Sequence, residues 1–192
     1  MSLVSDTGTE LRNKAVQWLV NLSVKRRRGG GNQERVKKLC YEFSVEPPKR
    51  EINESEIING YDELCSSVLT EPLGEMDVSK LLLLAEMTAI VSVGRDLKTN
   101  QIRRFLDGVK RMSTIVRQSA PAVFDKSEVE LLKIPLVYAA GRQQSAWHFA
   151  NTCMKAIDQI RPSGEEGFSD WQRFERFVEA IVAYHKFYKG GD

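Results

Sequence analysis

Apolar residues recur every three to four positions in segment after segment of this chain, and this spacing restricts its fold more than any other feature. In one example, six apolar side chains after Thr99 fall on one face of a helix with 3.6 residues per turn: Ile102, Phe105, Leu106, Val109, Met112 and Val116. The alternating pattern of a half-buried strand competes nowhere in the sequence. The sequence therefore predicts an all-α protein, a bundle of about seven to eight helices.

Capping residues and helix breakers divide the chain into these helices. The first is expected to end in the basic, glycine-rich loop KRRRGGG, and the second before Pro47-Pro48. Ser127 with Glu130 forms a predicted capping box for a sixth helix, in which Pro135 is expected to introduce a kink. The expected caps of the third, fourth and fifth helices are Asn53, Asp77 or Ser79, and Thr99. The fourth helix, LLLLAEMTAIVSV, is apolar on most sides, which predicts a central position in the core.

The composition is that of a folded globular protein. The chain has 192 residues, of which 42% are hydrophobic and 28% charged. Its longest unbroken apolar run, Leu81 to Ala85, is far shorter than the roughly 20 residues of a membrane-spanning helix. No secretory signal opens the sequence, so we expect a cytoplasmic protein without membrane contact. Three separated cysteines fit neither a disulfide framework nor a paired metal motif, which predicts buried free thiols at Cys40, Cys65 and Cys153.

The sequence offers no converging set of catalytic groups. It lacks the linear motifs of phosphate-binding loops, dinucleotide-binding folds and nucleophile elbows. The two histidines, His148 and His185, lie in separate predicted helices beside aromatic residues and lack the neighbours of a metal site. We interpret both as structural, and we expect no enzyme activity, no metal and no cofactor.

The net charge of +2 conceals a strong separation of charge along the chain. Residues 25–38 carry seven cations and one acid, residues 42–75 nine acids and two cations, and residues 95–117 seven cations and two acids. This alternation is typical of a basic surface for nucleic acid with an acidic region kept away from it. Pairing between the first two regions would produce the same pattern.

In the third region the cations recur seven residues apart, about 10 Å along the axis of the predicted helix. They form two rows: Arg103, Lys110 and Arg117, and beside them Arg104 and Arg111. Such rows suit the phosphates of a polyanion, although exposed cations commonly serve only solubility, and Arg103 could pair with Asp107. No aromatic residue is interleaved with these cations, since Phe105 belongs to the apolar stripe. This favours contact with a nucleic-acid backbone over base stacking.

Four blocks of the C-terminal half stand in a distinctive order. They are Ala85-Glu86, LKTNQIRRF at 97–105, LVYAAGR at 136–142, and FVEAIVAYHKFY at 177–188. In this order and spacing they resemble the small helical subunit of type III-A CRISPR effector complexes, the Csm small subunit, which tends to read LTTSQIRKF at the second block. The likeness covers about residues 77–192.

The resemblance implies a non-catalytic structural subunit of an antiviral ribonucleoprotein complex, stacked in several copies along the guide RNA and target RNA duplex. Its partners would be the backbones of these two RNAs, the backbone and large subunits of the complex, and further copies of itself. The nuclease activities would belong to the other subunits. The implied RNA-binding residues are Arg103, Arg104 and Arg142 in the matching blocks, with Lys110, Arg111 and Lys186 as their neighbours.

Two departures from that family concern the N-terminal part and the start of the basic helix. Residues 1–76 have no recognised counterpart, so we expect 1–76 to form an N-terminal helical extension with a basic glycine-rich loop and 77–192 to form the small-subunit bundle. The loop could extend the RNA contact or be a solvated connection. Lys98 and Asn100 replace the usual threonine and serine, and Lys98 adds a charge.

A second hypothesis of a different class is a protein-only helical adaptor. It would dimerise through the aromatic last helix, which carries Trp171, Phe174 and Tyr188, and would never contact nucleic acid. It predicts a discrete complex that is stable at high salt and free of RNA.

Overall fold

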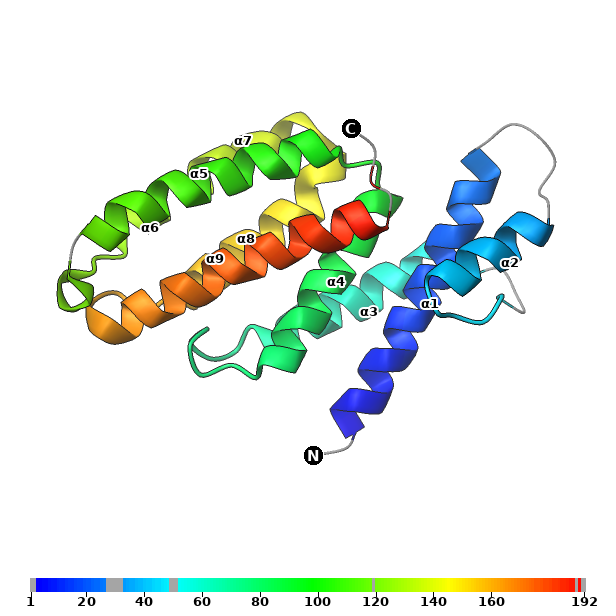
Figure 1. The fold of residues 1–192 in the computed structure, drawn as a ribbon, viewed down its shortest axis with the longest axis horizontal. Coiled ribbons are helices and arrows are strands. Elements are labelled where there is room, and N and C mark those ends of the chain that lie inside the picture. The colour runs from blue at the N-terminus through cyan, green and yellow to red at the C-terminus, as the bar shows by residue number, and fades with distance from the viewer. Residues whose placement is uncertain (1–2, 27–32, 49–51, 119, 189, 191–192) are drawn as a thin grey trace. The chain divides into compact units, whose positions relative to one another are not determined.

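Helices form almost all of the regular structure, as the apolar spacing predicted. The computed structural model describes residues 3–26, 33–48, 52–118, 120–188 and 190. Within them (Figure 1) the elements are α1 (Leu3–Arg26), α2 (Gln33–Glu42), α3 (Glu54–Val68), α4 (Val78–Gly94), α5 (Thr99–Gln118), the 3-10 helix η1 (Pro121–Val123), α6 (Ser127–Glu130), α7 (Lys133–Arg142), the 3-10 helix η2 (Gln144–Ala146), α8 (Trp147–Asp158) and α9 (Gly164–Phe187). The predicted all-α class is confirmed.

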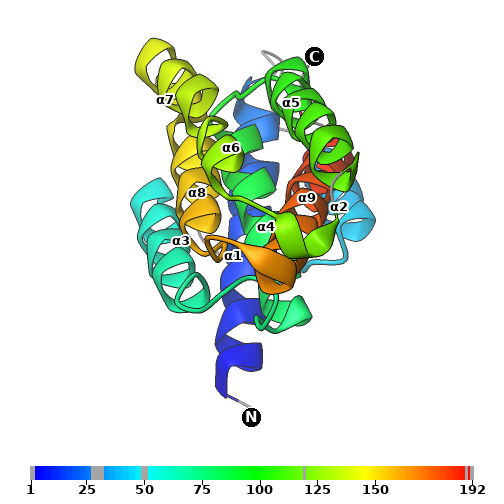
Figure 2. The same cartoon turned by 90° about the vertical axis from the view of Figure 1, so that its left-hand side faces the viewer.

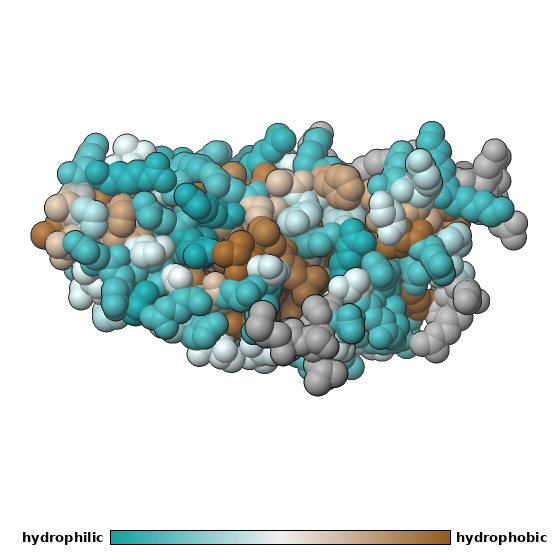
Figure 3. All heavy atoms as spheres, turned by 60° about the horizontal axis from the view of Figure 1, so that its bottom comes forward, coloured by the Kyte–Doolittle hydropathy of each residue, from teal (hydrophilic) through white to brown (hydrophobic). Residues whose placement is uncertain are grey.

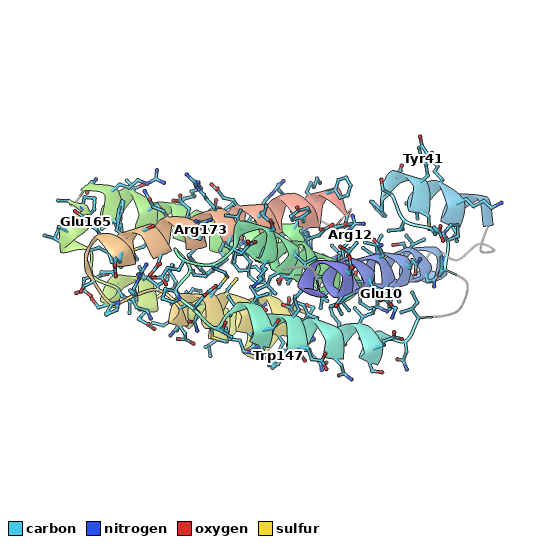
Figure 4. All side chains as sticks on the ribbon, turned by 90° about the horizontal axis from the view of Figure 1, so that it is seen from below. Glu10, Arg12, Tyr41, Trp147, Glu165 and Arg173 are labelled. Atoms are coloured by element: carbon cyan, nitrogen blue, oxygen red, sulfur yellow. The ribbon has the colours of Figure 1, made fainter. Side chains whose placement is uncertain are left out.

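Two compact units make up the chain, residues 1–64 and 65–192, and the division falls inside α3. In the first unit α1 packs against α2, and Lys14 of α1 forms ion pairs with Glu10 (3.0 Å) and Glu56 (3.3 Å). Tyr41 projects from α2 and is 87% exposed (Figure 4). Most of the loop KRRRGGG lies outside the described residues, so its contact with RNA stays a prediction, as does the domain boundary expected between residues 76 and 77.

In the second unit the helices pack around α4. Figure 2 views them from one end: α9 lies beside α4 and α5, and α8 lies beside α4 and α7. Most of α4 from Leu81 onward is buried, which confirms the central position predicted for this helix. Asp77 caps it, because its carboxylate accepts the backbone N–H groups of Ser79 at 2.8 Å and Lys80 at 3.1 Å.

The helices α5 and α9 run antiparallel, which contacts at two levels demonstrate (Figure 1). The Thr99 hydroxyl, at the start of α5, lies 3.2 Å from Nδ1 of His185 near the end of α9, and Lys110 reaches Glu175 farther along. Thr99 is the first helical residue, so the cap predicted there was wrong: its hydroxyl serves a tertiary contact. At this helix start Gln101 Oε1 accepts the backbone N–H of Lys98 at 3.1 Å.

The segment predicted as one kinked helix after Ser127 is instead two helices, α6 and α7, separated at residues 131–132. Pro135 lies in the first turn of α7, where its missing N–H costs nothing, and its ring would clash with the carbonyl of Leu131 in a continuous helix. The predicted capping box is also wrong. Ser127 is already helical, and its backbone N–H donates to Asp125 Oδ1 at 2.8 Å.

A buried carboxylate holds the start of α9. Asp170 is fully buried and accepts the backbone N–H groups of Gly74 (2.6 Å) and Arg161 (2.9 Å), together with two bonds from the Arg161 guanidinium (2.8 and 3.0 Å). A Cβ at Gly74 would lie 2.6 Å from Asp170 Oδ1, so this approach requires glycine. The carboxylate thereby joins the segment before α4 to the segment between α8 and α9.

The cysteines and His185 are interior residues. Cys40, Cys65 and Cys153 are buried thiols, as predicted, and burial raises the pKa of the Cys153 thiol. His185 is fully buried and lies with Nε2 3.0 Å from the Leu97 carbonyl oxygen, so Nε2 carries the proton that it donates. Burial lowers the pKa of His185 and favours the neutral ring.

Hydrophilic side chains cover most of the molecular face in Figure 3, with hydrophobic side chains in smaller areas among them. Among the described residues no helix is long and apolar enough to cross a membrane.

Candidate nucleic-acid interface

The two rows of cations on α5 face different neighbours. The helix buries Thr99, Ile102, Phe105, Val109 and Ser113, so its cations lie on the flanks and the outer side of this stripe. The first row approaches α9, whereas the second row borders a groove between α5 and α7. Because of this difference, cations that look equivalent in the sequence have different electrostatic surroundings.

In the first row, Lys110 and Arg117 are engaged by glutamates of α9. Lys110 Nζ lies 2.9 Å from Glu175 Oε1 and also pairs with Glu179, and Arg117 Nη2 lies 2.7 Å from Glu175 Oε2. The hydrogen bonds from Lys110 to Glu179 and Glu175 raise the pKa of its ammonium group. Burial alone would raise the pKa of Glu175, but its interactions with Lys110, Ser113 and Arg117 together outweigh burial and hold the pKa below its ordinary value. The charge of these two cations is therefore largely offset within the protein.

The second row is open. Arg104 and Arg111 are exposed, and both border a cavity of about 280 Å³ between α5 and α7. Arg142, the last residue of α7, borders the same cavity. We call this cavity the α5–α7 groove. Its apolar floor is formed by Leu97, Ile102, Phe105, Leu132, Leu136 and Phe149. Among its described lining residues no aspartate or glutamate opposes the three arginines.

A polar hollow adjoins the groove at the start of α5. Arg104 and Arg142 border both, and so do Gln101 and Gln143, whose side-chain amides are hydrogen-bonded to each other. The other residues that line the hollow are Asp96, Lys98, Asn100 and Ser145. The site thus changes from apolar at one end to polar at the other, where three cations and three side-chain amides outnumber the single acid among the described lining residues, Asp96.

An aromatic residue that the sequence pattern did not indicate also lines the groove. Tyr138 of α7 is 66% exposed and borders the same cavity as Arg104, Arg111 and Arg142. The observation that no aromatic residue is interleaved with the cations of α5 holds for that helix, but it did not foresee the aromatic residue that α7 adds to the groove. The signal was present in the block LVYAAGR, where Tyr138 precedes Arg142 by one helical turn and so shares its face.

Of the six predicted RNA-binding residues, the groove brings together Arg104, Arg111 and Arg142. Arg103, Lys110 and Lys186 are exposed but do not line it. The contact of these six residues with RNA stays a prediction.

The described residues that line this groove include no histidine, cysteine, aspartate or glutamate. Among the residues that the structure describes, no group of three or more histidine, cysteine, aspartate or glutamate side chains could hold a metal ion. The groove offers guanidinium donors, amides and apolar surface, which are binding groups rather than nucleophiles or general bases.

The fold defines the class as an all-α helical protein with an arginine-lined groove. Comparison with known proteins identifies the family. The Csm2 Type III-A family matches residues 75–191. The chain is also similar to the "CRISPR system Cms protein Csm2" of Streptococcus thermophilus, with 33% identity over 100 residues that cover 50% of this chain and 76% of the relative. No solved structure matches significantly. The chain therefore belongs to the type III-A Csm2 family, the small subunits of type III-A CRISPR complexes.

Proposed function

We propose that this chain is a non-catalytic, RNA-binding small subunit that lines the guide RNA and target RNA in a type III CRISPR interference complex of the cytoplasm. Family membership supports a place in the complex, and the α5–α7 groove supports the contact with RNA. The observation that carries the RNA contact is that three exposed arginines from two helices border one groove without an opposing acid in its lining. Guanidinium groups so arranged suit phosphates, which carry no sequence information by themselves.

The outer face of α6 and α7 supports contacts with other subunits or further copies. Four large apolar side chains are more than half exposed there: Leu131, Ile134, Val137 and Tyr138. Apolar side chains gathered on one exposed face are typical of protein interaction surfaces. A subunit that contacts both RNA and protein needs both kinds of surface.

The RNA contact is tested by the binding of labelled single-stranded RNAs of unrelated sequence at several salt concentrations. We expect the parent protein to bind them with similar affinities that fall steeply with salt, by about 0.7 in log–log slope per phosphate contact. The double variant Arg104→Glu/Arg111→Glu should bind more weakly to every sequence and flatten the slope. The matched control is Lys80→Glu/Arg176→Glu, which makes the same change in net charge at exposed positions outside the groove.

Equal binding by the Arg104→Glu/Arg111→Glu variant and the parent at every ionic strength would overturn the assignment of RNA contact to this groove. An equal loss in the Lys80→Glu/Arg176→Glu control would indicate only a response to net charge, and would also count against the groove.

The protein-only adaptor is the second candidate, favoured by the exposed apolar face of α6 and α7. Its predicted route through the last helix requires correction. Trp171, Phe174 and Tyr188 are 0–2% exposed, so they form the protein's own core and offer no surface for a dimer. Among the aromatic residues at that end of α9, Phe187 is 52% exposed. An RNA-free complex that survives high salt and is lost in Ile134→Glu would favour the adaptor.

A further inference from the structure

We propose that the α5–α7 groove holds one unstacked nucleotide of the bound RNA, with its base on the apolar floor and its phosphate at the arginines. This inference rests on the proposed function, and it adds the chemical form of the ligand. Contact with the RNA sugar-phosphate backbone alone would leave the apolar floor of the groove without a ligand. A base of the RNA would supply the group that contacts this floor.

The composition of the groove matches the two parts of a nucleotide. The apolar floor includes Phe105 and Phe149, which are 7% and 4% exposed and pack edge to face with their ring centroids 5.6 Å apart. Next to this floor stand the three arginines, and the adjoining hollow adds the amides of Gln101 and Gln143. A base, whose planar faces stack on apolar surface, joined to an anionic, hydrogen-bonding backbone is complementary to this gradient of polarity.

Tyr138 supplies the surface on which a base can stack. It lies at the rim of the groove with two thirds of its area exposed, whereas the floor phenylalanines are interior. Unpaired RNA bases are commonly held on aromatic side chains or guanidinium planes. Tyr138 and the neighbouring arginines offer both on one rim.

The size of the groove limits the ligand to about one base. Its volume of about 280 Å³ lies just below the roughly 300–1,000 Å³ of typical small-molecule sites. A duplex or a helical peptide would not enter it. No aspartate or glutamate is among the described residues that line the groove, and Asp96 of the adjoining hollow is one acid against three arginines. The site therefore favours an anionic ligand over an apolar side chain of a partner protein.

A larger side chain at position 108 would exclude the base from the groove without removing any of the arginines. Gly108 lines the groove on α5, and a Cβ there would lie 3.8 Å from Arg111 Nη2 and 3.9 Å from Leu132 Cδ2, which are ordinary contacts. Gly108→Leu should therefore fill the groove and keep all three arginines. The matched control is Gly141→Leu in α7, because nothing lies within 4 Å of a Cβ at Gly141 and it does not line the groove.

The experiment compares the affinity of the full chain for a short labelled oligouridylate with its affinity for an abasic oligonucleotide of the same length and charge. We expect the parent to prefer the base-containing strand by roughly 5- to 150-fold, the range that stacking of one base produces. Gly108→Leu and Tyr138→Ala should lose this preference and keep the affinity for the abasic strand. Gly141→Leu and Tyr138→Phe should retain it, and thermal melting checks that each variant is folded.

Three results would overturn the inference, and they separate it from the proposed function. If the parent binds both strands equally and Gly108→Leu changes nothing, while arginine reversal weakens both, the RNA-binding function stands and the base site fails. If neither strand binds at low salt, both fail. If Gly108→Leu leaves RNA binding intact but abolishes assembly with other subunits, the groove belongs to a protein partner.

Discussion

Glu175 pairs with two cations of α5, and Glu175→Gln tests whether this pairing withholds them from RNA. The carboxylate is 4% exposed and pairs with Lys110 and Arg117, whose side chains are 46% and 58% exposed. Removal of its charge releases both cations from the carboxylate that they share, although Lys110 keeps its pair with Glu179. Binding of RNA should become tighter while the fold becomes less stable.

Glu175→Gln should change both the stability of the fold and the affinity for RNA by amounts that follow from these contacts. Removal of one partner from a fully buried pair costs about 3–5 kcal/mol, but here the cations can turn to water, and half-exposed pairs contribute up to about 1 kcal/mol each. We therefore expect Glu175→Gln to lower the free energy of unfolding by about 1–2 kcal/mol. Each cation that then reaches a phosphate should steepen the salt slope by about 0.7, which is roughly a 2.6-fold change in affinity between 50 and 200 mM salt.

The pH dependence supplies a further check. Because the folded protein holds the pKa of Glu175 below its ordinary value of 4.5, the stabilisation is present above pH 4.5 and is lost as pH falls through the lower folded value. The difference in stability between parent and Glu175→Gln should therefore be largest near pH 7 and shrink in acid.

The assays are urea unfolding at several pH values and RNA binding at several salt concentrations. Glu165→Gln is the control, because it removes one negative charge from an exposed position near the start of α9 (Figure 4). Our reasoning is refuted if Glu175→Gln matches Glu165→Gln in both stability and salt slope.

Two further predictions concern the interior of the second unit. Asp170→Asn should lower the free energy of unfolding, measured in urea, by about 3–5 kcal/mol, because an amide N–H₂ group would face donors from Gly74 and Arg161. The control Asp158→Asn removes an exposed ion pair with Lys133 and should cost less than about 1 kcal/mol. Equal losses in the two variants would contradict the buried network. Because the pKa of His185 is lowered in the folded protein, its contribution to stability is present above the ordinary pKa of 6.5 and declines as pH falls below that value. His185→Gln should therefore reduce the loss of stability between pH 7.5 and 5.5. An unchanged pH profile of stability would count against a neutral, buried His185.

The individual helices were predictable because their signals are local. Apolar spacing determines which face of a segment is buried, so α4 was expected in the centre and the stripe of α5 on the core. Asn53 and Asp77 were recognisable as caps because a cap acts on backbone groups two or three residues away, and both are confirmed. Where local signals competed with tertiary contacts, as at Thr99, the predicted cap was wrong. Where Pro135 excludes a continuous helix, the predicted kink is instead a break between α6 and α7.

By itself the sequence determined the all-α class, the family and the number of cations on α5. Only the tertiary structure decided which of these charges remain open. It set Lys110 and Arg117 against Glu175 on a helix more than 50 residues away in sequence and grouped Arg104 and Arg111 with Tyr138 and Arg142 of another helix. The physical reason is that helical periodicity gives the direction of a side chain about its own axis, whereas its charge environment depends on which helix packs beside it.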